Sequence, residues 1–128
     1  MSETKIKYFT PAEAVKTLPL VKQIVKDILY SGYQIKSIAE STAGEIEDNE
    51  EALRLADDIK KYMKELEEIG CYYKDWNFSI GLVDFPSIIN GEEVFLCWKS
   101  DEENISFYHG VYEGYSGRKE IPKELLQD

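Results

Sequence analysis

The chain has one histidine, His109, and two cysteines, Cys71 and Cys97, among its 128 residues. Two cysteines so far apart do not form the disulfide framework of a small secreted protein. No apolar run is long enough to span a bilayer, and the first ten residues lack the apolar core of a signal peptide. We therefore expect a cytoplasmic protein with reduced thiols and no membrane partner.

The sequence also lacks an excess of positive charge. It has 25 acidic residues against 15 lysines and arginines, which gives a formal net charge of −10. Such a surface repels the phosphates of nucleic acids, so we expect no nucleic-acid partner. The sequence contains no phosphate-binding loop, dinucleotide-binding fingerprint or serine nucleophile elbow, and these absences argue against the corresponding enzyme classes.

The first half of the chain predicts two helices. Thr10, Pro11 and Glu13 form a helix-start signal with the elements of a capping box. Apolar residues then recur at helical spacing. Pro19 falls inside this pattern and is expected to kink or restart the helix. Gly32 is a candidate stop, and continuation of the helix past it is the alternative.

A second helix is expected from Glu50 to Ile69, where apolar residues alternate by three and four positions. Asp48 and Glu51 supply its start signal, and Gly70 ends it. The linker between the two helices is short, which predicts an antiparallel helical hairpin. Its two apolar stripes need a third surface to cover them.

The second half of the chain supplies that surface. Short segments rich in aromatic and β-branched residues (CYYKD, LVDF, EEVFLCWK and ISFYHGVY) are separated by turn residues. Asn90-Gly91 is the clearest hairpin turn, and residues 100–104 form the second. Helices followed by antiparallel strands predict an α+β fold, with the antiparallel helical hairpin packed on a small antiparallel β-sheet. We expect a single domain, 1–128, made of an N-terminal segment (1–9), the helical hairpin (10–70), a β-hairpin region (71–118) and a C-terminal tail (119–128).

The register of the second hairpin decides what lies beside His109. If its turn is centred on Glu103, Cys97 lies opposite His109, and a metal site or a thiolate–imidazolium pair becomes feasible. If the turn is centred between Glu102 and Glu103, His109 opposes Leu96 and joins an apolar face. The second register gives the more apolar face, so the sequence favours it.

Five sequence stretches are similar to one known family. They are YFTPAEA with the later LP pair, GLVDFP at 81–86, VFLCW at 94–98, FYH at 107–109 and EGYSGR at 113–118. The chain resembles the uncharacterised prokaryotic family named domain of unknown function 2203 over nearly its whole length. The family has no assigned reaction, so the resemblance implies a shared fold and a set of positions of interest. At those positions this chain keeps Cys97, Glu102 and His109 and has Tyr108 where the family usually has tryptophan.

Two functions follow from these residues. The favoured one is a non-catalytic binding or protein-interaction module that self-associates, giving a homo-oligomer, with a further protein partner also considered. Its contact would be the helical hairpin or a sheet edge. Aromatic residues that are expected to remain partly available would contribute to such an interface; they are Tyr72, Tyr73, Trp76, Phe78, Phe85, Tyr112 and Tyr115.

The alternative is a small metal-binding protein or metal-dependent enzyme that holds zinc, iron or manganese. Its candidate ligands are His109, Cys97, Glu102 and Glu113, with Asp84 in the surrounding shell or as a further ligand. Other candidates for contact with a ligand are Asp84, Tyr108 and Arg118. The stretch from Gly114 to Arg118 has two glycines and a guanidinium, which suit a phosphate or carboxylate.

Overall fold

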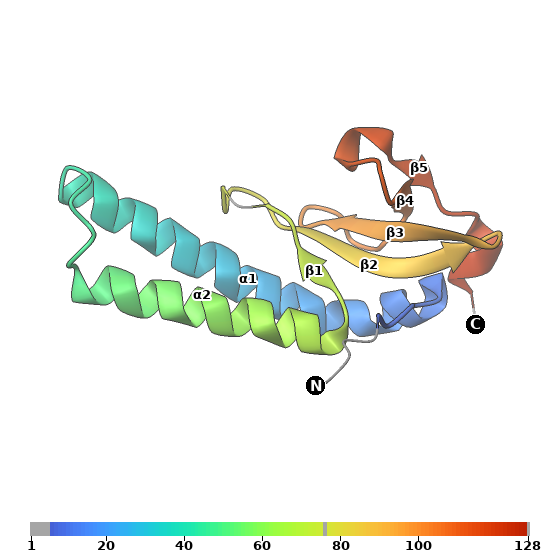
Figure 1. Cartoon of the computed structure of the whole chain (residues 1–128), viewed down its shortest axis with the longest axis horizontal. Helices are drawn as coiled ribbons and strands as arrows, with labels where there is room; N and C mark the ends of the chain where they lie inside the picture. The colour runs from blue at the N-terminus through green and yellow to red at the C-terminus, as the bar shows by residue number, and fades with distance from the viewer. Residues whose placement is uncertain (1–5, 76, 128) are drawn as a thin grey trace.

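The computed structural model describes residues 6–75 and 77–127. Two helices lie under one face of a five-stranded sheet (Figure 1). The elements are α1 (Pro11–Ser41), α2 (Glu50–Ile69), β1 (Tyr72–Tyr73), β2 (Leu82–Ile89), β3 (Glu92–Lys99), β4 (Phe107–Gly110), η1 (Tyr115–Gly117), β5 (Lys119–Glu120) and η2 (Lys123–Leu126). The strands follow the order β1-β2-β3-β4-β5, and all neighbouring pairs are antiparallel. The predicted α+β fold is confirmed.

The start of α1 follows the sequence signal. The Thr10 side chain accepts a hydrogen bond from the Glu13 backbone N–H, and the Glu13 carboxylate accepts one from the Thr10 backbone N–H. The helix continues through Pro19, so the expected restart there does not occur. Leu18 and Val21, on either side of Pro19, are buried in the core. Their packing favours a continuous helix even though proline removes one backbone hydrogen bond.

The other helix boundaries were predicted in part. α1 continues past Gly32 to Ser41, which is the alternative that the sequence left open. The missing side chain of Gly32 makes room for Phe78, because a Cβ atom on Gly32 would lie 2.6 Å from the Phe78 Cβ. The N-cap of α2 is Asn49 and not Asp48, and the Asn49 side chain accepts a backbone hydrogen bond from the first turn. Gly70 ends α2 as predicted, with a φ of 112° in the left-handed region.

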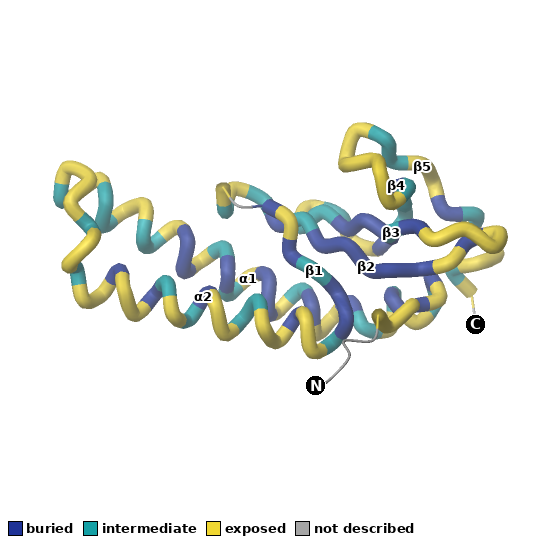
Figure 2. The backbone as a smooth tube through the Cα atoms, viewed as in Figure 1, coloured by how far each residue is buried: buried dark blue, intermediate teal, exposed yellow. Residues whose placement is uncertain are grey.

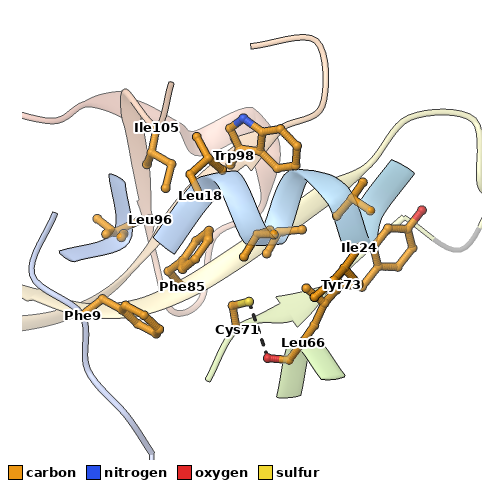
Figure 3. Close-up of a cluster of buried hydrophobic side chains, with 14 of the residues drawn as sticks. Phe9, Leu18, Ile24, Leu66, Cys71, Tyr73, Phe85, Leu96, Trp98 and Ile105 are labelled. Atoms are coloured by element: carbon orange, nitrogen blue, oxygen red, sulfur yellow. Dashed lines mark hydrogen bonds between the residues drawn. The ribbon is translucent and has the colours of Figure 1, made fainter. Parts of the chain in front are cut away.

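The core lies between the sheet and the helices (Figures 2 and 3). Leu96 and Trp98 of β3 are buried there with Phe85 of β2, and Figure 3 shows them grouped around Leu18 of α1. The opposite face of β3 carries Cys97 and its neighbours in the alternating pattern, as the sequence predicted. That second face is not covered by the helices (Figure 1).

The two hairpins of the sheet were predicted with different success. Asn90 and Gly91 both have positive φ, 52° and 80°, as a two-residue hairpin turn requires. In the second hairpin Phe95 pairs with His109, so the turn is centred on Glu102. Neither expected register occurs, and the favoured one, in which His109 joins the apolar face, is wrong.

The loop between β3 and β4 explains the observed register. Ile105 is fully buried in the core, so the loop is longer than a tight turn. Glu102 fixes the start of the loop: its carboxylate accepts a hydrogen bond from the Lys99 backbone N–H, and its carbonyl accepts one from the Trp98 indole. The burial of Ile105 and these two hydrogen bonds set the register. They outweigh the alternation of apolar strand residues, on which the prediction for His109 was based.

The chain after β4 returns to the sheet. β5 pairs with β4, and Ile121, which follows β5, is 3% exposed and part of the core. Between β4 and β5, residues 111–118 pass over the face of the sheet that lies away from the helices (Figure 1). None of the described helices has the length and apolar character needed to cross a membrane.

Gly81→Ala is expected to destabilise the fold, because Gly81 directly precedes strand β2 and lies in close contact with α1. A Cβ atom at Gly81 would lie 2.4 Å from the Val25 Cγ1, so the helix or strand must shift. Overpacking of this kind costs about 1–3 kcal/mol in the free energy of unfolding. Urea denaturation measures the change. Gly114→Ala is the control, because a Cβ atom at Gly114 would have no atom within 4 Å apart from those of its neighbours in the chain. Equal stability of the two variants would contradict the helix–sheet contact.

Candidate functional site

Three chemically reactive side chains meet on the face of the sheet away from the helices. Asp84 on β2 lies directly opposite Cys97 on β3, and His109 on β4 lies one step diagonally beyond. One ligand atom from each lies within 4.8 Å of the others. The residues are 5%, 2% and 4% exposed, respectively. Strand pairing thus brings a carboxylate, a thiol and an imidazole into one buried cluster.

The hydrogen bonds of His109 define the protons in this cluster. The imidazole Nδ1 lies 2.9 Å from the Gly110 carbonyl oxygen, which can only accept, so Nδ1 carries a proton. The Nε2 atom lies 3.2 Å from Oδ1 of Asp84. A hydrogen bond there needs one proton, from either the carboxyl group or the imidazolium. Asp84 and His109 therefore share a single proton between Oδ1 and Nε2.

Burial favours the uncharged forms of the other two groups. It raises the pKa of Asp84, and the nearby His109 and Lys74 offset only part of that effect. Burial, with the Asp84 carboxylate adding to it, raises the pKa of the Cys97 thiol to about 12. The cluster is thus a thiol beside a carboxyl–imidazole pair that holds one proton in the hydrogen bond between them.

A hollow of about 250 Å³ lies next to the cluster. Its lining includes all three cluster residues, together with Lys74 and Tyr115. The chain after β4 forms one wall. Arg118 holds that wall in place: its guanidinium stacks on Phe107 at 4.1 Å and on Tyr115 at 4.8 Å, measured to the ring centroids. The cluster therefore has a formed space beside it that a bound molecule can enter.

Glu102, a candidate metal ligand, and Arg118, a candidate contact for a bound molecule, bind each other. Nη2 of Arg118 donates to Oε2 of Glu102 at 2.5 Å, while Oε1 of Glu102 accepts from the Lys99 backbone N–H at 2.8 Å. One oxygen of Glu102 thus holds the β3–β4 loop to the chain around residue 118, and the other holds it to the end of β3. This pair lies outside the Asp84–Cys97–His109 cluster and supports it structurally.

Glu113 and Tyr108 occupy two other positions. Glu113 lines the hollow, but its Oε1 accepts a hydrogen bond from the Gly110 backbone N–H at 2.9 Å. Tyr108 pairs with Leu96 and packs against the core on the helix side of the sheet. Of the residues that the sequence singled out, the structure brings together Asp84, Cys97 and His109.

The expected aromatic face is divided between the interior and the surface. Tyr73 and Phe85 are buried in the core, whereas Tyr112 is fully exposed. Trp76 lies outside the described residues. These positions do not form a single aromatic surface, so the aromatic content alone does not define an interface.

Sequence reasoning named Asp84 only as a surrounding or further ligand, whereas the structure makes it a central member of the cluster. The signal for this role was a charged residue inside the apolar stretch LVDFP, because a buried charge needs a partner. Sequence reasoning missed Lys74, although alternation along the chain places it on the same side as Tyr72. The positions of both residues became clear only when the strand pairing was known.

The fold and the cluster define a small α+β protein with a buried carboxylate–thiol–imidazole site beside a hollow. Residues 7–121 match the family described as uncharacterized conserved protein DUF2203, and the chain belongs to this family. No curated protein and no solved structure gives a significant match. The resemblance inferred from the sequence is thus confirmed, and the function has to be argued from the site itself.

Asp84→Asn is expected to change the pH dependence of stability in the metal-free protein. Burial raises the pKa of Asp84 above its unfolded value of about 4, so the folded state keeps a proton that the unfolded chain loses. The contribution of this group to the free energy of unfolding is fully present below about pH 4 and is lost as the pH rises through the folded pKa. Each unit of pKa shift corresponds to about 1.4 kcal/mol.

The measurement is urea unfolding of both proteins in chelator between about pH 3.5 and pH 8. The side-chain amide that the substitution introduces can donate to Nε2 of His109 without titrating, so only the wild type shows the loss. A wild type that gains stability over the variant as the pH rises would mean that His109 holds Asp84 ionised, contrary to this assignment.

Proposed function

We propose that the protein binds one divalent transition-metal ion, with zinc as the preferred metal, through Asp84, Cys97 and His109. The observation that carries this proposal is the convergence of the three ligand atoms within 4.8 Å in a buried site. In a tetrahedral zinc site such atoms lie about 3.4–3.6 Å apart. A shift of roughly 1 Å, which side-chain rotation supplies, brings the most distant pair to this spacing.

The chemistry of the donor set favours zinc. One thiolate, one imidazole and one carboxylate form a mixed set of the kind that zinc accepts, whereas magnesium and calcium prefer oxygen ligands alone. Three protein ligands leave a fourth position for water or another small ligand. The hollow of about 250 Å³ provides space on that side. This arrangement is typical of zinc sites that react with or bind a molecule, in contrast to closed structural sites with four protein ligands.

The Gly110 carbonyl supports a ligand role for His109. A histidine that binds a metal usually donates its other ring N–H to a carbonyl or carboxylate, which fixes the tautomer and the ring orientation. Here Nδ1 donates to the Gly110 oxygen and Nε2 is directed at Asp84. A metal ion that takes the place of the shared proton would bind both Nε2 of His109 and the Asp84 carboxylate, while Nδ1 keeps its hydrogen bond to Gly110.

The purified wild-type protein is expected to bind one equivalent of Zn²⁺ in isothermal titration calorimetry. Asp84→Asn and Cys97→Ala each remove a ligand and are expected to weaken binding at least about 100-fold, since loss of a supporting residue alone costs 10–100-fold. Cys71→Ala is the matched control. Cys71 is also buried, but it lies in the core, where its thiol contacts the Leu66 carbonyl (Figure 3).

Equal zinc affinity of wild type and Cys97→Ala would contradict the proposed ligand set. So would a wild type that binds neither zinc nor cobalt, iron or manganese at micromolar concentrations. Circular dichroism and urea unfolding of each variant confirm that a lost metal reflects a lost ligand and not an unfolded chain.

Zinc binding is also expected to release about two protons near neutral pH. One comes from the Cys97 thiol, whose pKa is about 12, and one is the proton that Asp84 and His109 share. Calorimetry in buffers of different ionisation enthalpy counts these protons, and the affinity should rise roughly 100-fold per pH unit. Release of no protons would mean that zinc binds elsewhere.

Self-association is a second candidate, and an exposed aromatic pair on α1 favours it. Tyr30 and Tyr33 are 63% and 69% exposed and lie one helical turn apart on α1. Exposed tyrosines of this kind are enriched at protein interfaces. Analytical ultracentrifugation of wild type and Tyr30→Ser/Tyr33→Ser tests this candidate. A dimer that the double substitution disrupts supports it, and a monomeric wild type at high concentration contradicts it.

A further inference from the structure

A second hollow adjoins the metal site on the same face of the sheet. It has a volume of about 320 Å³, compared with about 250 Å³ beside the cluster. The two share three lining residues, Lys74, Phe95 and Val111. They are therefore two lobes of one groove, which we call the sheet groove, with the Asp84–Cys97–His109 cluster at one end.

The lobe away from the cluster is mainly apolar. Its lining includes Ile6, Tyr72, Pro86, Phe95 and Val111. Ile6 and Val111 are 55% and 40% exposed, although they are large apolar side chains. A lobe of this size and lining suits the hydrocarbon part of a small molecule.

Lys74 supplies a positive charge where the two lobes meet. Its ammonium lies 5.8 Å from the centre of the Phe95 ring. Within residues 6–75 and 77–127 it has no carboxylate within 4 Å. The carboxylates at the two ends of the groove are engaged, Glu93 by the Tyr8 hydroxyl and Glu113 by the Gly110 N–H.

The cluster itself does not repel an anion, because it is electrically neutral. The shared proton makes the metal-free Asp84–His109 pair neutral, and Zn²⁺ with one carboxylate, one thiolate and a neutral imidazole is neutral as well. Glu93 and Glu113 keep their negative charges towards the two ends of the groove, and Lys74 supplies the positive charge at the junction between the lobes. This sign contrasts with the net charge of −10 of the whole chain, so an anionic group is drawn to this point.

We propose that the sheet groove binds a small organic carboxylate with an apolar body. Its carboxylate lies between the Lys74 ammonium and the open position of the metal, and its hydrocarbon part lies in the apolar lobe. This inference deepens the proposed function, because the metal supplies the second contact for the carboxylate. The Lys74 contact and the apolar lobe do not depend on the metal.

Octanoate is the probe that tests this proposal, with acetate and octylamine as controls. Calorimetry on the zinc-loaded protein is expected to show octanoate binding at least about 50-fold more tightly than acetate, because each buried methylene contributes roughly fourfold. Octylamine has the same chain with the opposite charge and is expected to bind at least about tenfold more weakly than octanoate.

Two lysine variants identify the anion contact. Lys74→Met keeps the apolar stem and removes the charge, and it is expected to weaken octanoate binding about two- to fivefold. Lys60→Met, on the exposed side of α2, is the control and should leave binding unchanged. Amide chemical-shift changes at Lys74, Phe95 and Val111 locate the bound octanoate. Octanoate that binds no better than acetate, or equally well to Lys74→Met, would overturn the proposal.

The same titrations on the zinc-free protein separate this proposal from the metal site. Octanoate binding that persists there, weaker but still dependent on Lys74, supports the carboxylate proposal even if no metal binds. Conversely, a protein that binds zinc through Asp84, Cys97 and His109 but does not distinguish octanoate from octylamine keeps its metal site and loses the carboxylate proposal.

Discussion

A carboxylate buried in the middle of an antiparallel sheet is the constraint on which this site depends. Asp84 lies on β2 and is 5% exposed, so its charge would be costly without a partner. The partner is His109, which comes 25 residues later on β4. Because one strand lies between them, β3 must pair with both neighbours so that these two side chains meet over it. The hydrogen bond between Asp84 and His109, with its shared proton, thus forms only when all three strands are correctly paired.

This constraint also determines what else the cluster contains. The residue of β3 that faces Asp84 is Cys97, so a thiol completes the group. A purely structural pair would need only the carboxyl group and the imidazole. The thiol, the hollow and the fixed tautomer of His109 are additional features, and they are the ones that support the proposed metal site. The helices lie against the other face of the sheet (Figure 1), and the hollow beside the cluster lies on this one.

Local signals in the sequence predicted local structure well. The capping box at Thr10, the stop at Gly70 and the Asn90-Gly91 turn each depend on a few neighbouring residues, and all three are confirmed. The faces of β3 also followed from alternation alone. Such features depend on residues that are close together in the sequence, and tertiary packing reinforces them.

The site was harder to predict because it depends on register. A shift of one residue moves His109 to the other face of the sheet. The register is set by Ile105, which the core draws in, and by the hydrogen bonds that Glu102 makes to the start of the loop. Neither effect is visible in the alternation of the strands. For the same reason Glu102 was expected to bind a metal, whereas it holds the β3–β4 loop to Arg118.

X-ray absorption at the zinc edge of the zinc-loaded protein tests the central claim most directly. The account predicts one sulfur neighbour at about 2.3 Å and nitrogen or oxygen neighbours at about 2.0–2.1 Å in a four-coordinate site. The sulfur signal should be absent from any zinc bound to Cys97→Ala and present for Cys71→Ala. A zinc ion surrounded by nitrogen and oxygen atoms alone, or a sulfur signal that depends on Cys71, would contradict the assignment of Asp84, Cys97 and His109 as a metal site.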